Sequence, residues 1–320
     1  MPLDAPEERP AAGIPAPAEE RGRGTVEEVE FWSGGRPRVA LLHWPARYSR
    51  GEARPAAVLA HGLANDRDEA GQFGPLAERL VEEGHVVLRF DFRGGTRDLD
   101  PGRQLPASEW PHDLAAAVVC ARGLPGVDAS QVGVIGASCG GSVALVAAGF
   151  DPELRYVITL GCFADGADWL RGLWSAQYGE LGWQRFLADV RDDRIRRSAG
   201  ERSRRVPLAG GFLPVPDDAV EAVEELLRAN PGMLRELSLE TADDLLLLSP
   251  VAFAGRGVVP VLLVHGARDT LVPAADAERL EWALGRRATR VVLDEGLHQL
   301  LLGTSRNAVL DLVSQWIHER

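Results

Sequence analysis

The chain of 320 residues contains no lysine, and all 35 of its basic residues are arginine. Enzymes that form a Schiff base through a lysine, including those that depend on pyridoxal phosphate, are therefore excluded. P-loop nucleotide hydrolases are excluded as well, because their lysine contacts the phosphates. The 47 acidic residues give a formal net charge of −12. A nucleic-acid binder needs a basic surface to neutralise phosphates, so we expect no nucleic-acid partner.

Cysteines are few, and long apolar runs are absent. Cys120, Cys139 and Cys162 form no C-x-x-C pair, which argues against a disulfide framework or a metal site and favours a reducing compartment. No apolar run approaches the roughly 20 residues that span a bilayer. The amino-terminal residues lack the apolar segment of a secretory signal. We therefore expect a cytoplasmic protein without a membrane anchor, and no cofactor is implied.

The chain divides by composition. Residues 1–24 consist mainly of Pro, Ala, Glu, Arg and Gly, which predicts a disordered tail. A core follows at residues 25–162 and resumes at 251–320. Between these parts, residues 163–250 show helical and loop-like patterns but no strong strand pattern. An insertion of this length between core strands predicts a helical lid.

Short apolar runs alternate with helical patterns through the core. The later runs are continuously apolar, as in strands buried on both faces of a parallel sheet. The expected strands are Val26–Trp32, Arg38–Trp44, Ala57–Ala60, Val86–Phe90, Val132–Ile135, Tyr156–Leu160, Val259–Val264 and Arg290–Leu293. The expected helices are Phe73–Glu83, His112–Arg122, Gly140–Gly149, Ala274–Leu284 and Arg306–His318. This order predicts an α/β fold with a mostly parallel eight-stranded sheet and flanking helices, in which a short turn pairs the first two strands antiparallel.

A nucleophile motif stands between the strand Val132–Ile135 and a helix rich in small residues. It reads Gly136-Ala137-Ser138-Cys139-Gly140, which is G-x-S-x-G between a strand and a helix. A sharp turn at Ser138 would lift its hydroxyl clear of the sheet, and glycines on both sides would avoid collisions. The helix amino terminus would also stabilise negative charge beside the serine.

A serine hydroxyl needs a general base, and a third group must orient that base. His298 is our candidate base among the seven histidines, because it lies in a loop directly after the last strand. Asp269 is the candidate acid, since it follows the buried strand Val259–Val264. Asp165, beyond the strand Tyr156–Leu160, is a competitor for this role. We set His265 aside as a partner because it precedes Asp269 too closely.

The oxyanion of an acyl-transfer reaction needs two amide donors. One expected donor is the Cys139 amide, next to the nucleophile. The other is the Leu63 amide, because Gly62 in the sequence His61-Gly62-Leu63 lets the chain turn after the third strand. The Cys139 thiol is either reactive, at a helix amino terminus, or a small packing group, and we favour packing.

These motifs resemble those of the α/β-hydrolases over residue 25 to the end, apart from the insertion. Asp91-Phe92-Arg93-Gly94 also matches the family's D-x-R-G turn, in which the Asp and the Arg are usually structural. The next residues, Gly95-Thr96-Arg97-Asp98, depart from the family's commoner pattern. The resemblance therefore does not identify which side chains of this loop line the pocket. The opening HG…DRDE…FGPLAERL is most similar to carboxylesterases and acyl-peptidases. The resemblance implies a serine hydrolase with Ser138, Asp269 and His298 as its catalytic triad.

The insertion is rich in arginine. Its basic residues are Arg185, Arg191, Arg194, Arg196, Arg197, Arg202, Arg204 and Arg205. The acidic residues of the same stretch are Asp189, Asp192, Asp193 and Glu201. The arginines either form ion pairs on a solvated helix or dock an anionic partner, such as an acyl carrier protein or a coenzyme A ester. The three tryptophans Trp169, Trp174 and Trp183 either wall an acyl pocket or hold the insertion to the core.

Four functions follow from these residues. The first is hydrolysis of a carboxylic ester through an acyl-enzyme. The second is thioester hydrolysis or acyl transfer, with docking through the arginines. The third is an elimination with His298 as the base, and the fourth is a non-catalytic ligand-binding scaffold, which the intact triad disfavours.

Overall fold

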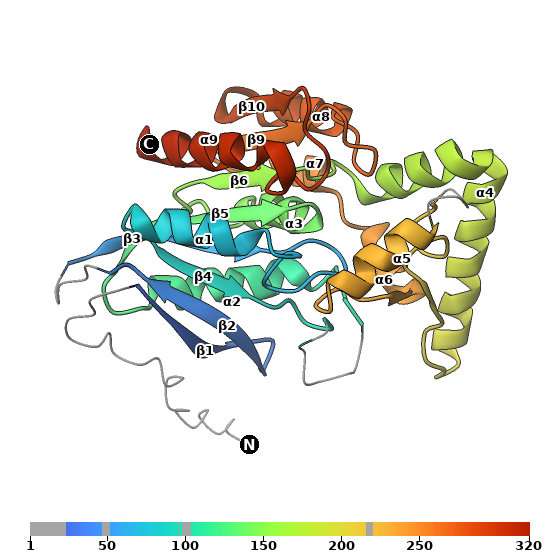
Figure 1. Cartoon of the computed structure of the whole chain (residues 1–320). Helices are drawn as coiled ribbons and strands as arrows, with labels where there is room; N and C mark the ends of the chain where they lie inside the picture. The colour runs from blue at the N-terminus through green and yellow to red at the C-terminus, as the bar shows by residue number, and fades with distance from the viewer. Residues whose placement is uncertain (1–23, 47–51, 96, 98–103, 216–219) are drawn as a thin grey trace, which may run out of the picture.

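An eight-stranded β-sheet forms the centre of the molecule (Figure 1). The structure is a computed structural model that describes residues 24–46, 52–95, 97, 104–215 and 220–320. The expected tail 1–24 lies outside the described residues except for its last residue. The strands are β1 (Thr25–Ser33), β2 (Arg36–Trp44), β3 (Arg54–Ala60), β4 (Val86–Phe90), β5 (Val127–Ala137), β6 (Val157–Leu160), β9 (Val261–Gly266) and β10 (Ala288–Leu293).

The spatial order of the sheet is β1-β2-β4-β3-β5-β6-β9-β10. Strand β2 pairs antiparallel with both β1 and β4, and the remaining pairs are parallel. Gly34 and Gly35, both with positive φ, make the tight turn between β1 and β2. The predicted fold class and the predicted antiparallel first pair are confirmed.

Helices cover both faces of the sheet. The helices α1 (Phe73–Glu82) and α9 (Arg306–His318) share one apolar core with Ala57 and Leu59 of β3. Residues Ala56 and Val58 of the same strand belong to the core on the other face, because side chains alternate along a strand. That second face is covered by α2 (Trp110–Arg122), α3 (Cys139–Ala148), α7 (Pro250–Ala254) and α8 (Ala275–Leu284).

The insertion follows β6 and lies beside the ends toward which β5 and β6 point (Figure 1). It contains α4 (Gly166–Ser198), β7 (Arg205–Pro207), α5 (Val220–Ala229), β8 (Glu236–Ser238) and α6 (Leu239–Leu245). Helix α4 is kinked at Gly179, where φ is 69° and ψ is 178°. The expectation of an insertion without strands is wrong, because β7 and β8 pair antiparallel. Each is only three residues long, too short for an alternating pattern to be recognised.

Several predicted boundaries also differ from the structure. Strand β5 begins at Val127 rather than Val132, through a polar stretch that the apolar pattern missed. Strand β9 covers Val261–Gly266, so it starts and ends two residues later than expected. Helix α2 begins at Trp110 rather than His112. Within the described part of the chain, no helix has the length and apolarity needed to cross a membrane.

Candidate active site

Ser138 occupies a sharp turn between β5 and α3. Its φ of 50° and ψ of −124° are strained for a residue that carries a side chain. A Cβ atom on Gly136 would lie 2.5 Å from the Gly140 backbone, and one on Gly140 would lie 2.1 Å from the Ala60 carbonyl oxygen. Glycine is therefore required on both sides of the turn, as the motif predicted.

The three residues of the predicted triad lie together after three different strands. The Ser138 hydroxyl oxygen is 3.0 Å from His298 Nε2. His298 Nδ1 is 2.7 Å from Asp269 Oδ2. Both distances are within hydrogen-bonding reach for a nucleophile, a base and an orienting acid.

The carboxylate of Asp269 is buried and held on both of its oxygens. Its Oδ1 accepts hydrogen bonds from the amides of Leu271 and Val272, at 2.9 and 2.8 Å. Its Oδ2 faces His298 and lies 3.5 Å from Nε2 of His265. That nitrogen donates to the Val272 carbonyl at 2.8 Å, and burial lowers the pKa of His265. The sequence argument that set His265 aside therefore missed a neutral histidine beside the acid.

Asp165, the other candidate for the acid, lies at the start of α4. It is the N-cap residue of α4, and its carboxylate accepts a hydrogen bond from the Asp168 amide at 3.0 Å. A cap of this kind satisfies an otherwise unbonded amide at the helix start. Asp269, and not Asp165, contacts the imidazole of His298.

The loop after β3 lies against the nucleophile turn. A Cβ atom on Gly62 would lie 3.1 Å from the Cβ of Ser138. Leu63 lines the same cavity as Ser138, and Cys139 is the first residue of α3. The amides of Leu63 and Cys139 remain the predicted oxyanion donors.

Two further sequence features have structural roles. Arg93 of the D-x-R-G turn donates to both carboxylate oxygens of Asp113, and Asp91 accepts from the Arg67 amide. The Cys139 thiol is fully buried, and burial raises its pKa far above the usual value. It is therefore a neutral packing group, as we favoured, because a thiolate is needed for reactivity.

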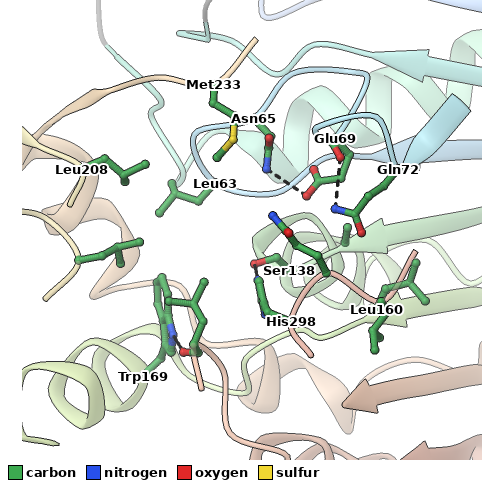
Figure 2. A pocket seen from close by; sticks show the side chains of 15 residues that line it. Leu63, Asn65, Glu69, Gln72, Ser138, Leu160, Trp169, Leu208, Met233 and His298 are labelled. Atoms are coloured by element: carbon green, nitrogen blue, oxygen red, sulfur yellow. Dashed lines mark hydrogen bonds between the residues drawn. The ribbon is translucent and has the colours of Figure 1, made fainter. Parts of the chain in front are cut away.

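A cavity of about 100 Å³ opens beside Ser138 and His298 (Figure 2). One part of its wall is apolar and includes side chains from the insertion. The apolar lining residues are Leu63, Ala137, Leu160, Trp169, Leu208, Leu213, Met233, Leu271 and Leu300. Besides Ser138 and His298, the polar lining residues are Asn65, Glu69 and Gln72 from the loop after β3 and Gln299 from the loop after β10. Among the described residues, no cluster of three His, Cys, Asp or Glu side chains could hold a metal ion.

The tryptophans of the insertion divide between the two expected roles. Trp169 lines the cavity, and its indole N–H donates to the Leu271 carbonyl at 2.8 Å. Trp174 stacks on Phe186 with ring centroids 4.7 Å apart, and Trp183 packs on the same ring. One tryptophan therefore walls the pocket, and two hold the insertion together.

Several arginines of the insertion form ion pairs within it. Arg194 and Arg197 both contact Asp243 of α6, and Arg204 lies 2.6 Å from Asp189. These pairs favour the solvated ion-pair interpretation. The docking of an acyl carrier protein or a coenzyme A ester remains a prediction.

The polar residues of the cavity wall were not predicted. Asn65 and Glu69 belong to the charged stretch 65–69, which a sequence pattern cannot distinguish from a solvated loop. Glu69 is nevertheless only 4% exposed. A signal was present in the apolar helix that follows directly, since Phe73 and Leu76 anchor this loop in the core.

Proteins similar to this chain include two of known sequence and one of known structure. A quorum-quenching protein, AidA, from Acinetobacter baumannii is 27% identical over 253 residues, which cover 77% of this chain and 80% of that protein. A thiohydrolase, aneE, from Aspergillus aculeatus is 33% identical over 138 residues, or 42% of this chain and 41% of that one. The crystal structure of the α/β-hydrolase GrgF from Penicillium sp. sh18 superimposes with a TM-score of 0.75 at 21% identity, over 92% of this chain and 98% of that chain.

Residues 51–304 match the family described as serine aminopeptidase, S33. The match spans most of the chain, including the turn at Ser138, Asp269 and His298. Together with the eight-stranded sheet, it establishes that this chain belongs to the S33 serine aminopeptidase family of α/β-hydrolases.

Proposed function

We propose that this protein hydrolyses a carboxylic ester through an acyl-enzyme on Ser138. The single observation that carries the proposal is the chain of contacts from the Ser138 hydroxyl to His298 Nε2, at 3.0 Å, and from His298 Nδ1 to Asp269, at 2.7 Å. This is the arrangement that an acyl-transfer reaction needs for its nucleophile, base and orienting acid.

In the proposed first step, His298 Nε2 takes the hydroxyl proton as Ser138 Oγ bonds to the carbonyl carbon of the ester. The Leu63 and Cys139 amides hold the resulting oxyanion. When the tetrahedral intermediate collapses, the bond to the alcohol oxygen breaks, and His298 gives its proton to that oxygen. Asp269 stabilises the imidazolium in the meantime.

In the second step, His298 removes a proton from a water molecule, whose oxygen attacks the acyl carbon. Collapse of this second intermediate releases the carboxylic acid and returns the proton to Ser138 Oγ. The apolar side of the cavity, formed in part by Trp169, Leu208 and Met233, suits the acyl chain of the substrate. We propose that residues 163–250 act as a lid, because they supply these side chains.

A thioester is the second candidate substrate. The similarity to a thiohydrolase favours it, although the match covers less than half of either chain. Arg202 and Arg205 of the insertion also line a surface hollow, together with Arg197 and the acidic Glu201 and Glu240. We propose this hollow as the place where an anionic carrier would dock. The same triad would act on either substrate, since only the leaving group differs.

The experiment is the turnover of p-nitrophenyl esters, from acetate to decanoate, by wild type and by Ser138→Ala. Loss of a triad member should lower kcat by at least ~10³-fold. Ser130→Ala is the matched control, because Ser130 is exposed on β5 and should leave turnover unchanged. Absence of ester turnover in the wild type, or equal turnover in Ser138→Ala, would overturn the proposal. Carrier-bound thioesters would then test the second candidate.

A further inference from the structure

A buried carboxyl group that this mechanism does not use lies beside the nucleophile. Glu69 is 4% exposed, on the loop between β3 and α1, and lines the cavity together with Ser138 and His298 (Figure 2). Its Oε2 accepts a hydrogen bond from the Gly62 amide at 2.5 Å. Its Oε1 lies 3.0 Å from the side-chain nitrogen of Asn65. The carboxyl group therefore connects the cavity to residues 61–64, which we call the oxyanion loop.

Two successive peptide groups of the oxyanion loop are held by side chains. Glu69 holds the amide of Gly62. His61 Nδ1 is 2.8 Å from the Gly62 carbonyl oxygen and donates to it. That carbonyl belongs to the same trans peptide as the Leu63 N–H, so the N–H points the opposite way. Fixing both peptides fixes the direction of the donor that the proposed mechanism requires.

The backbone around Glu69 is strained. Ala64, Glu69 and Ala70 have φ values of 62°, 47° and 51°, although none of them is glycine. A positive φ is unfavourable for a residue with a side chain, because the Cβ atom lies too close to a neighbouring carbonyl oxygen. Strain of this kind persists only where the surroundings enforce it. Here the strained residues lie in the loop whose Gly62 amide and Asn65 side chain contact the Glu69 carboxyl group.

We propose that Glu69 is a positioning residue that holds the oxyanion loop so that the Leu63 N–H faces the Ser138 hydroxyl. The inference rests on the proposed function, because the oxyanion belongs to that reaction. A glutamate at this place is useful only if it adds no negative charge beside the oxyanion. The carboxyl group of Glu69 must therefore be neutral at the pH of the reaction.

Burial raises the pKa of Glu69 to about 8, and the nearby Asp66 carboxylate adds to the rise, while the Gly62 amide opposes it. The other titratable groups that face it are the neutral Cys139 thiol of the nucleophile turn and His298 across the cavity. Within the described ranges, no arginine forms an ion pair with Glu69. The group is therefore neutral near pH 7, and Asn65 can pair with either form because an amide offers both a donor and an acceptor.

Three variants separate the two parts of the proposal. Glu69→Gln keeps a neutral acceptor for the Gly62 amide but cannot ionise. Glu69→Ala removes the acceptor and leaves a buried amide without a partner. Glu78→Gln, on the exposed side of α1, removes one negative charge nearby and is the matched control.

The experiment measures kcat and KM for a p-nitrophenyl ester from pH 6 to pH 10, with thermal unfolding of each variant. We expect Glu69→Ala to lower kcat by about 10²-fold, the scale for loss of one oxyanion donor, with little change in KM. In the wild type, kcat should fall as the pH rises through about 8. That fall should be absent from Glu69→Gln and present in Glu78→Gln. Unchanged kcat in folded Glu69→Ala, or the same alkaline fall in Glu69→Gln, would overturn the proposal.

A second measurement separates this proposal from the proposed function. A fluorophosphonate forms a tetrahedral adduct on an activated serine, and its rate depends on the oxyanion donors whether or not esters are substrates. We expect Glu69→Ala to slow the labelling of Ser138, and Glu69→Gln to restore it. If the wild type does not turn over esters but Glu69→Ala is labelled more slowly than the wild type, only the esterase proposal is wrong. If Glu69→Ala is labelled at the wild-type rate, the proposed role of Glu69 is wrong.

Discussion

The Ser138 hydroxyl lies 3.0 Å from His298 Nε2, although 160 positions separate the two residues in the chain. Strand β5 delivers the serine, and the loop after β10 delivers the histidine, at the same edge of the sheet. Parallel strands end at one edge, which is where such folds place their sites. The contact is therefore a product of the topology rather than of any local pattern.

Replacement of the base should remove most of the activity. His298→Gln keeps a polar side chain of similar size but cannot carry the hydroxyl proton, so we expect kcat to fall by at least ~10³-fold. Steady-state kinetics with a p-nitrophenyl ester measures this loss. His112→Gln, at an exposed position of α2, should behave as the wild type. Full activity in His298→Gln would mean that another group accepts the proton.

The two candidate acids should respond differently. Asp269→Asn should lower kcat by about 10³–10⁴-fold, because the carboxylate no longer orients and stabilises the imidazole. Asp165→Asn should leave kcat unchanged and cost at most about 1 kcal/mol of stability, since asparagine also caps a helix. Kinetics and urea unfolding on both variants check the pair. The reverse result would identify Asp165, which follows β6, as the acid of the triad.

The nucleophile turn should not tolerate a methyl group. In Gly140→Ala, the new Cβ would lie 2.1 Å from the Ala60 carbonyl and 2.4 Å from the His61 carbonyl, so the oxyanion loop must shift. We expect a loss of about 3 kcal/mol in the free energy of unfolding, and little activity. Gly172→Ala is the control in α4, where the added Cβ meets nothing within 4 Å. Gly172→Ala should stabilise the helix by about 0.5–1 kcal/mol. Equal destabilisation of Gly140→Ala and Gly172→Ala would show that the close contacts at Gly140 are not the cause.

The apolar side of the cavity should set the preferred acyl length. Leu208 is 5% exposed and lines the cavity from the insertion. Leu208→Ala should extend the pocket and raise kcat/KM for longer acyl chains relative to acetate, by about fourfold for each methylene that becomes buried. Comparison of acetate, butyrate and octanoate esters tests this. Leu247→Ala, at a side chain 77% exposed, is the control and should leave the ranking unchanged.

The local parts of the site could be predicted from the sequence. The turn at Ser138 has a short motif between a strand and a helix, and Asp269 and His298 follow apolar strands directly. Apolar periodicity reports burial, so it also located the eight strands of the sheet. Strands β7 and β8 were missed because three residues carry no period.

The environment of Glu69 could not be predicted in this way. A run of charged residues ordinarily indicates a solvated loop, and only the fold shows that this carboxyl group is buried beside Ser138. The contact of His265 with Asp269 was missed for a related reason. Their four-residue spacing looked too short, but the turn after β9 returns the Asp269 carboxylate to the His265 ring.

The most direct test of the account is to trap the acyl-enzyme. Wild type and Ser138→Ala would be mixed with a p-nitrophenyl ester, quenched in acid within milliseconds, digested and examined by mass spectrometry. We predict one acyl group per chain on the peptide that contains Ser138 in the wild type, and none in the variant. An acyl group on another residue, or ester turnover that persists in Ser138→Ala, would contradict the role of Ser138 as the nucleophile.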